Sequence, residues 1–330
     1  DGVLEGRSNE SLLKHQWRAL HDQREVRAKE KGCALRFHRY IPSSYEQKWY
    51  DHVKEWETNL EKAVNSDEEK LIANRWISAV VASGKTPLNQ STPLPHDIFS
   101  HFLYELPCEG RHIRVDIEPI AGLTRNPRFL QARAGVVDKS YMYVNASAAL
   151  ETLRANDGAV AIYIDFGASL YDAGAGGASQ KWFVEQFESV GIQFSHIYAF
   201  EAEKKDSKDV FNRIASNLLP SYHWYNVPIS SQPGDKFFAW RFLKEIAQKQ
   251  DYVLVKLDID NTRVEEEIIR YLLQDESLMD LIDEMFWEHH VNIHAMYPHW
   301  HTEKEKSYLH DTYEHFRKLR ERGIRAHSWV

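Results

Sequence analysis

The chain has 330 residues, enough for one large domain or two smaller ones. Its 41 basic and 49 acidic residues give a formal net charge of −8, which argues against a nucleic-acid partner because such proteins usually carry a basic surface. Its two cysteines are too few for a disulfide framework or a cysteine metal site. The acidic balance instead favours a small-molecule or carbohydrate partner. No apolar run approaches the roughly 18 residues of a membrane span.

The first part of the chain, residues 1–110, is predicted to be a mainly helical region. Apolar residues recur at three- and four-residue spacing over 11–31 and 45–64, which is typical of amphipathic helices. Ser66 precedes three acidic residues and predicts the N-cap of a helix that runs through Val81. The Ser-, Thr- and Pro-rich stretch 83–95 predicts a linker or long loop.

The second part, residues 111–330, is predicted to be one α/β domain. Alternating apolar residues predict short strands at 113–117 and 141–143. After residue 158, apolar strands alternate with helices. The predicted strands cover 161–166, 196–200, 223–229, 252–257, 281–287 and 324–329, and the predicted helices cover 180–190, 208–219, 236–249, 263–274 and 303–322. This order indicates a Rossmann-like, mostly parallel sheet with helices on both faces.

Ligands of open parallel sheets bind at the carboxyl ends of the strands, so the site is expected there. The strand over 161–166 ends at Asp165 and Phe166, followed by Gly167, Ala168 and Ser169, where a glycine lets the backbone approach a ligand closely. The spacing is not that of a dinucleotide-binding Gly-x-Gly-x-x-Gly turn. The next strand ends at Glu201, whose carboxylate can accept hydrogen bonds from both hydroxyls of a ribose.

The last two candidate groups lie at the ends of the strands over 252–257 and 281–287. Asp258 and Asp260 are two residues apart and are expected to point to the same side, where they can orient a substrate, hold a divalent cation or act as a base. Helix capping is the alternative role for one of them. His289 and His290 are candidate bases or metal ligands, and at most one of them can face the pocket because neighbouring strand residues point to opposite faces.

At these strand ends the sequence resembles class I S-adenosylmethionine-dependent methyltransferases, specifically the FkbM-like branch. Phe200-Glu201 matches a Phe-Glu pair of that branch, the run 256–261 matches its Lys-Ile-Asp-Val-Glu-Gly pattern with Asp260 and Asn261 as departures, and Glu288 matches a terminal acid. Residues 111–330 are also similar to uncharacterised methyltransferase-like proteins of plants and algae. Ala168 stands where the branch usually has the residue between two glycines, and Ser169 replaces the second glycine.

The resemblance implies a methyltransferase that uses S-adenosylmethionine and methylates an oxygen of a small or sugar-like acceptor. The implied cofactor contacts are Asp165, Gly167, Ala168 and Ser169 on the methionine side, Glu201 and Ala202 at the ribose, and Pro228 and Ile229 at the adenine. Asp258, Asp260 and one of His289 and His290 would face the acceptor, with a divalent metal as a further option. Two alternatives stay open: another nucleotide-dependent sugar or redox enzyme, and a non-catalytic binding protein.

Overall fold

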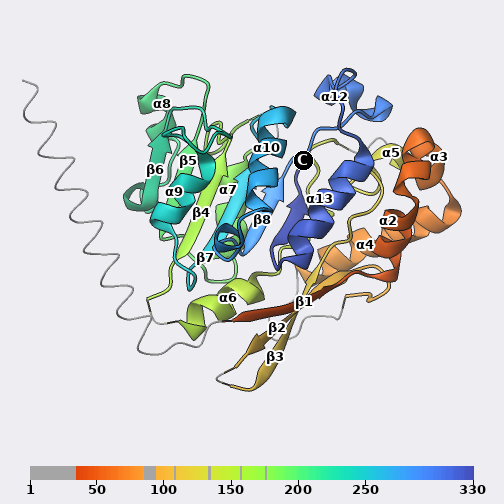
Figure 1. Ribbon diagram of the computed structural model, residues 1–330, viewed down its shortest axis with the longest axis horizontal. Coiled ribbons are helices and arrows are strands. Elements are labelled where there is room, and N and C mark those ends of the chain that lie inside the picture. The colour runs from red at the N-terminus through yellow and green to blue at the C-terminus, as the bar shows by residue number, and fades with distance from the viewer. Residues whose placement is uncertain (1–34, 85–93, 108, 133–134, 157, 175–176) are drawn as a thin grey trace, which may run out of the picture.

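The computed structural model describes residues 35–84, 94–107, 109–132, 135–156, 158–174 and 177–330. Its centre is a six-stranded sheet in which all neighbouring strands run parallel, in the order β6-β5-β4-β7-β8-β9 (Figure 1). The strands are β4 (Ala161–Phe166), β5 (His196–Phe200), β6 (Tyr222–Tyr225), β7 (Tyr252–Leu257), β8 (Glu284–Trp287) and β9 (Arg325–Ser328). The predicted Rossmann-like α/β fold is confirmed, and the strand order reverses between β4 and β7, where such sheets bind ligands.

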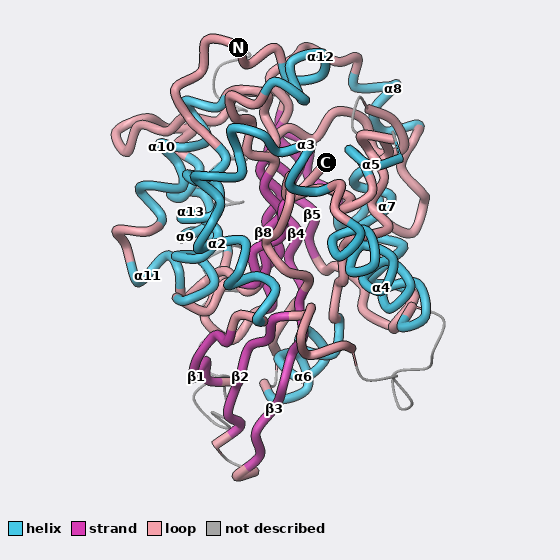
Figure 2. Tube along the Cα trace, turned by 90° about the vertical axis from the view of Figure 1, so that its right-hand side faces the viewer, coloured by secondary structure: helices cyan, strands magenta, loops and turns pink. Residues whose placement is uncertain are grey.

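Helices cover both faces of this sheet, as Figure 2 shows. One face carries α9 (Ala239–Ile246), α10 (Thr262–Leu272) and α13 (Leu309–Glu321), and the other carries α7 (Ser179–Glu188). Every residue of β4 and β7 is buried, which explains their unbroken apolar runs. Phe183 of α7 packs against Phe286 of β8 and Trp329, with ring centroids 4.7 and 4.9 Å apart. Aromatic packing therefore fixes α7 on its face of the sheet.

The described part of the N-terminal region contributes the helices α2 (Ser44–Trp56), α3 (Leu60–Val64) and α4 (Asp67–Ser83). The predicted cap of α4 is confirmed, because the Ser66 side chain accepts a hydrogen bond from the Glu69 amide at 3.2 Å. Trp49 and Trp76 are completely buried, so the aromatic residues of these helices form core. The predicted helix over 11–31 and most of the predicted loop 83–95 lie outside the described residues.

A second, three-stranded antiparallel sheet joins the two parts of the chain. It consists of β1 (Arg36–Ile41), β2 (Ser100–Leu106) and β3 (Arg111–Ile117), of which only β3 was predicted. The predicted division between residues 110 and 111 falls in the turn between β2 and β3, which pair along their whole length. This sheet lies at the opposite end of the molecule from α12 (Tyr297–Trp300) (Figure 1).

Several predicted elements are corrected. Residues 141–143 are not a strand, because their backbone bonds to side chains instead of a ladder: the Tyr143 amide donates to the Glu118 carboxylate at 2.9 Å and the Tyr141 carbonyl accepts from Trp76 Nε1 at 2.8 Å. Strand β6 ends at Tyr225, where Asn226 turns to donate to the Glu201 and Glu203 carbonyls. The remaining helices are the short α5 (Phe129–Ala132), α6 (Ala146–Ala155), α8 (Ser207–Asn212) and α11 (Glu276–Met279). Among the described residues, no helix is long and apolar enough to cross a bilayer.

Buried ion pairs connect α2 and the segment after β3 to the C-terminal helix and strands. Arg320 of α13 donates to the Glu46 carboxylate of α2 at 2.9 Å. His327 of β9 lies between the carboxylates of Glu118 and Glu284, at 2.7 and 2.9 Å. All five side chains are buried, so removing one partner would leave a buried charge unpaired and destabilise the fold.

Candidate functional site

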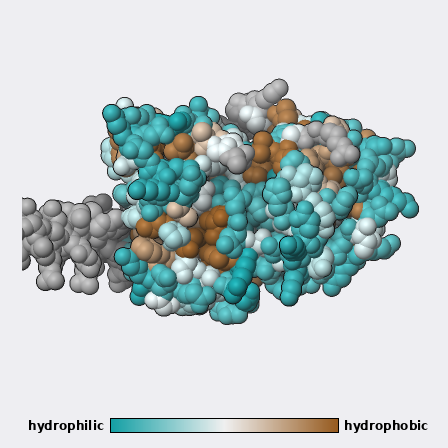
Figure 3. All heavy atoms as spheres, turned by 90° about the horizontal axis from the view of Figure 1, so that it is seen from above, coloured by the Kyte–Doolittle hydropathy of each residue, from teal (hydrophilic) through white to brown (hydrophobic). Residues whose placement is uncertain are grey.

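A cavity of about 900 Å³ opens at the carboxyl ends of β4, β5, β7 and β8. Figure 3 looks onto this end of the molecule, where apolar patches lie among polar side chains. Nine of the residues predicted for the site line the cavity: Gly167, Ser169, Glu201, Ala202, Pro228, Ile229, Asp258, Asp260 and His290. The other three, Asp165, Ala168 and His289, are buried behind its wall.

The loop after β4 is held by its own backbone. Gly167 has a φ of 90°, and the amides of Gly167 and Ala168 both donate to the Phe200 carbonyl, at 3.0 and 2.9 Å. A Cβ on residue 167 would stand 1.6 Å from the Asp258 carbonyl oxygen. Glycine is therefore needed to bring the ends of β4 and β7 together, and these two amides are already used and cannot cradle a phosphate.

Glu201, at the end of β5, is oriented by two backbone amides. The Ser169 amide donates to Oε2 and the Glu203 amide donates to Oε1, each at 2.7 Å. Within the described part of the chain, no lysine or arginine forms an ion pair with this half-buried carboxylate. Each oxygen keeps a lone pair, so the carboxylate can still accept hydrogen bonds from a ligand in the cavity.

Lys256 is a buried cation beneath the cavity. Its Nζ lies 3.3 Å from Asp165, 3.0 Å from Asp258 and 3.0 Å from the Gly167 carbonyl. Burial opposes the charge of Lys256, but the two carboxylates outweigh it and raise the pKa of the lysine. Burial also raises the pKa of Asp165, which the Tyr163 hydroxyl approaches at 2.8 Å. Asp165 therefore positions Lys256 and the loop, and does not itself reach the cavity.

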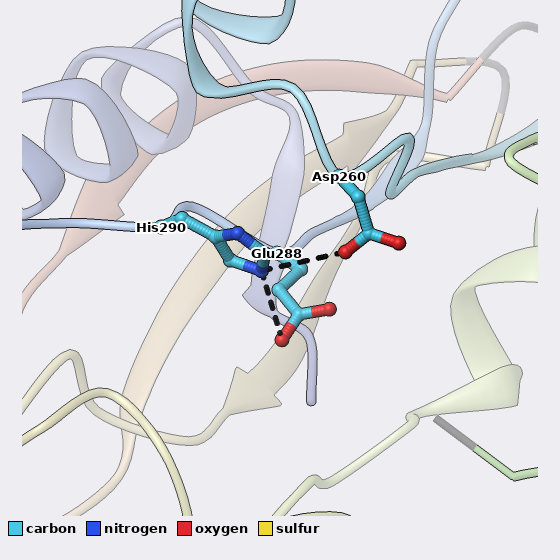
Figure 4. Close-up of side chains that lie close together, drawn as sticks. All are labelled: Asp260, Glu288 and His290. Carbon is cyan, nitrogen blue, oxygen red and sulfur yellow. Dashed lines mark ion pairs between the residues drawn. The ribbon is translucent and has the colours of Figure 1, made fainter. Parts of the chain in front are cut away.

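The end of the cavity beside β8 carries a mixed polar cluster. Glu288 is paired with the buried guanidinium of Arg125 and accepts a hydrogen bond from Trp300 Nε1 at 3.2 Å. His290 Nε2 lies 3.4 Å from Glu288 Oε1 and 3.9 Å from Asp260 Oδ1 (Figure 4). Burial would lower the pKa of His290, but the Glu288 carboxylate outweighs it and the pKa is raised. This cluster offers both a proton acceptor and metal-binding oxygens.

The His289 side chain points away from the cavity, toward α10 and α13. Its Nδ1 contacts the Thr312 hydroxyl at 3.0 Å, its Nε2 contacts Glu266 at 3.1 Å, and its ring stacks on Trp287 with centroids 4.3 Å apart. Burial lowers the pKa of His289, although the neighbouring Glu266 carboxylate opposes this effect. Of the two adjacent histidines, His290 alone reaches the cavity, and His289 belongs to the packing between β8, α10 and α13.

Some lining residues were not assigned a role from the sequence. Arg125 and Trp300 are far from the strand-end motifs in the chain, and no spacing links them to Glu288. Lys256 carries a usable signal, because a lysine inside the otherwise apolar run of β7 must have buried acidic partners. Comparisons with known proteins add no relative: no family model, curated protein or solved structure matches the chain.

Proposed function

We propose that the protein binds S-adenosylmethionine in this cavity and methylates a hydroxyl group of a small or sugar-like acceptor. The observation that carries the proposal is Glu201. Its carboxylate lies at the end of β5, beside the reversal in strand order, and two backbone amides orient it toward a ligand. An acid in this position is suited to accept hydrogen bonds from both ribose hydroxyls of an adenosine group.

The charge of the cavity favours a cationic cofactor over a dinucleotide. Its lining has five carboxylates and three lysine or arginine side chains: Glu201, Glu203, Asp258, Asp260 and Glu288 against Arg125, Lys205 and Lys256. Each of the three cations is paired with one of these acids, at Glu288, Glu203 and Asp258. A pyrophosphate would meet this acidic surface, and the amides of Gly167, Ala168 and Ser169 are already bonded within the protein. The sulfonium of S-adenosylmethionine, in contrast, is a cation and carries a methyl group activated for transfer.

The other lining residues suit the remaining parts of such a cofactor and its acceptor. Val227, Pro228 and Ile229 give an apolar wall beyond β6 for an adenine ring, next to Phe200. Asp260 and His290 lie at the far end, beside β8, where the acceptor hydroxyl must lose its proton. Holding that oxygen in line with the methyl group would provide much of the rate enhancement of methyl transfer, because the two bound reactants are already oriented and need not meet in solution.

Calorimetric titration with S-adenosylmethionine and S-adenosylhomocysteine tests the proposal, with NAD as the competing ligand. We expect both to bind in the micromolar range and Glu201→Ala to weaken binding by about tenfold or more, since hydrogen bonds to a charged group are lost. Glu185→Ala is the matched control, because this exposed acid of α7 lies outside the cavity lining and faces Lys181 at 3.8 Å. Binding of NAD alone would favour the redox alternative, and binding of none of the three would favour a non-catalytic protein.

A further inference from the structure

We propose that Asp260, Glu288 and His290 form a binding site for one divalent metal ion at the acceptor end of the cavity. The metal site is argued from these side chains alone, and only its role in the reaction rests on the proposed function. The three ligand atoms lie within 4.8 Å of one another (Figure 4). They come from two neighbouring strand ends, Asp260 after β7 and the other two after β8.

The spacing of the three atoms fits a shared ion. Two ligands that each lie about 2.2 Å from an ion can be at most about 4.4 Å apart. His290 Nε2 is 3.4 Å from Glu288 Oε1 and 3.9 Å from Asp260 Oδ1, so both pairs already meet this limit. The Asp260 side chain is 80% exposed and can rotate to close the third pair.

Neighbouring side chains hold Glu288 and His290 in place, as is usual for metal ligands. The Glu288 carboxylate accepts hydrogen bonds from the Arg125 guanidinium and from Trp300 Nε1, and the His290 ring stacks on Trp300 with centroids 5.1 Å apart. Such outer contacts orient the ligating oxygen and nitrogen and limit their motion. Both hydrogen bonds end on Glu288 Oε1, so an ion would bind Glu288 through its other carboxylate oxygen, beside the exposed Asp260 carboxylate.

The local charge also favours a cation. Three carboxylates line this end of the cavity, those of Asp258, Asp260 and Glu288, whereas Arg125 and Lys256 are the cations paired with this group. A divalent ion would offset this excess of negative charge.

One imidazole and two carboxylates suit a transition metal such as Mn²⁺ better than Mg²⁺, which prefers oxygen ligands alone. Three protein ligands leave coordination positions open for water or an acceptor oxygen. A hydroxyl bound to the ion loses its proton to solvent more readily. Its oxygen then forms the new C–O bond to the methyl carbon, and the electrons of the broken C–S bond leave with the neutral thioether.

Mn²⁺ titration of the full chain, followed by the electron paramagnetic resonance signal of the free ion, tests the site. We expect one Mn²⁺ per chain, and binding at least about tenfold weaker in Asp260→Asn. Residue 260 has a φ of 53°, which asparagine adopts as readily as aspartate, so the variant should fold. Glu245→Gln, an exposed acid on α9, is the matched control and should bind Mn²⁺ as the wild type does.

Two results would overturn the metal site: no loss of free Mn²⁺ signal at millimolar ion, or equal binding by wild type and Asp260→Asn. The outcome is separate from that of the cofactor titration. Mn²⁺ binding without S-adenosylmethionine binding would retain the site and reject the methyltransferase. Cofactor binding without Mn²⁺ binding would retain the methyltransferase and reject the metal.

Discussion

The Cα of Gly167 lies so close to the Asp258 carbonyl that a side chain on residue 167 would overlap it, with a Cβ 1.6 Å from the oxygen. This contact joins the ends of β4 and β7, the two strands between which the sheet reverses its order. Gly167 therefore serves strand packing, and the same loop lines the cavity with Gly167, Ser169, Gly174 and Gly177.

Gly167→Ala is expected to lower the free energy of unfolding by about 3 kcal/mol, because the new methyl group clashes with backbone and the φ of 90° is unfavourable for alanine. Gly191→Ala is the control, since residue 191 has a similar φ of 84° and no atom lies within 4 Å of its Cβ position. It should cost only about 1 kcal/mol. Urea unfolding measures both, and equal costs would refute the role of the contact with Asp258.

Lys256→Met is expected to destabilise the protein by about 3–5 kcal/mol, because it leaves the buried carboxylates of Asp165 and Asp258 without their cation. Lys249→Met removes an exposed pair with Asp280 and should change stability by less than about 1 kcal/mol. Thermal and urea unfolding compare the two. A loss at residue 256 no larger than at residue 249 would show that the buried pairs contribute little.

The main sheet could be predicted because its strands are buried on both faces and therefore read as continuous apolar runs. β4 and β7 match their predicted bounds. β1 and β2 could not be predicted in this way: β1 carries the exposed residues Arg36, His38 and Arg39, and its pairing with β2 links segments about sixty residues apart. Such pairing is decided by tertiary contacts, which local patterns do not report.

The sequence predicted the site residues that directly follow strands, but not those that reach the cavity from other parts of the chain. Glu201, Asp258 and Asp260 follow strands and line the cavity, as their positions predict. The choice between His289 and His290 needed the structure, since neighbouring residues after β8 point to opposite sides and the sequence does not tell which side faces the cavity. Arg125 reaches Glu288 from a separation of 163 residues, which no spacing in the sequence reveals.

The ion pairs of His327 predict how stability depends on pH. Burial opposes the charge of His327, but Glu118 and Glu284 outweigh it and raise its pKa above 6.5, so its contribution is present below that pH and is lost as the pH rises through the raised value. Burial also opposes the charges of the two glutamates, but His327 helps to lower their pKa values below 4.5, with Arg325 the larger influence on Glu284. Their contribution is therefore present above 4.5 and is lost as the pH falls through the lowered values.

We therefore expect the urea midpoint of the wild type to decline on both the acid and the alkaline side. His327→Gln should lower the free energy of unfolding by about 3 kcal/mol at neutral pH, because it leaves buried acids unpaired. The variant should also lose the alkaline part of the pH dependence that comes from this histidine. An unchanged alkaline profile would mean that His327 is neutral in the folded protein.

The two adjacent histidines give the last prediction, because substitution separates packing from ligand binding. His289→Gln should cost about 2 kcal/mol of stability through loss of its stacking on Trp287 and its contact with Glu266, and leave Mn²⁺ affinity unchanged. His290→Gln should cost about 1 kcal/mol or less and weaken Mn²⁺ binding by about tenfold or more, because its ring nitrogen faces Glu288 and Asp260. Unfolding and Mn²⁺ titration of both variants measure the contrast. The reverse pattern would place the functional histidine on the other face of β8 and remove His290 from the site.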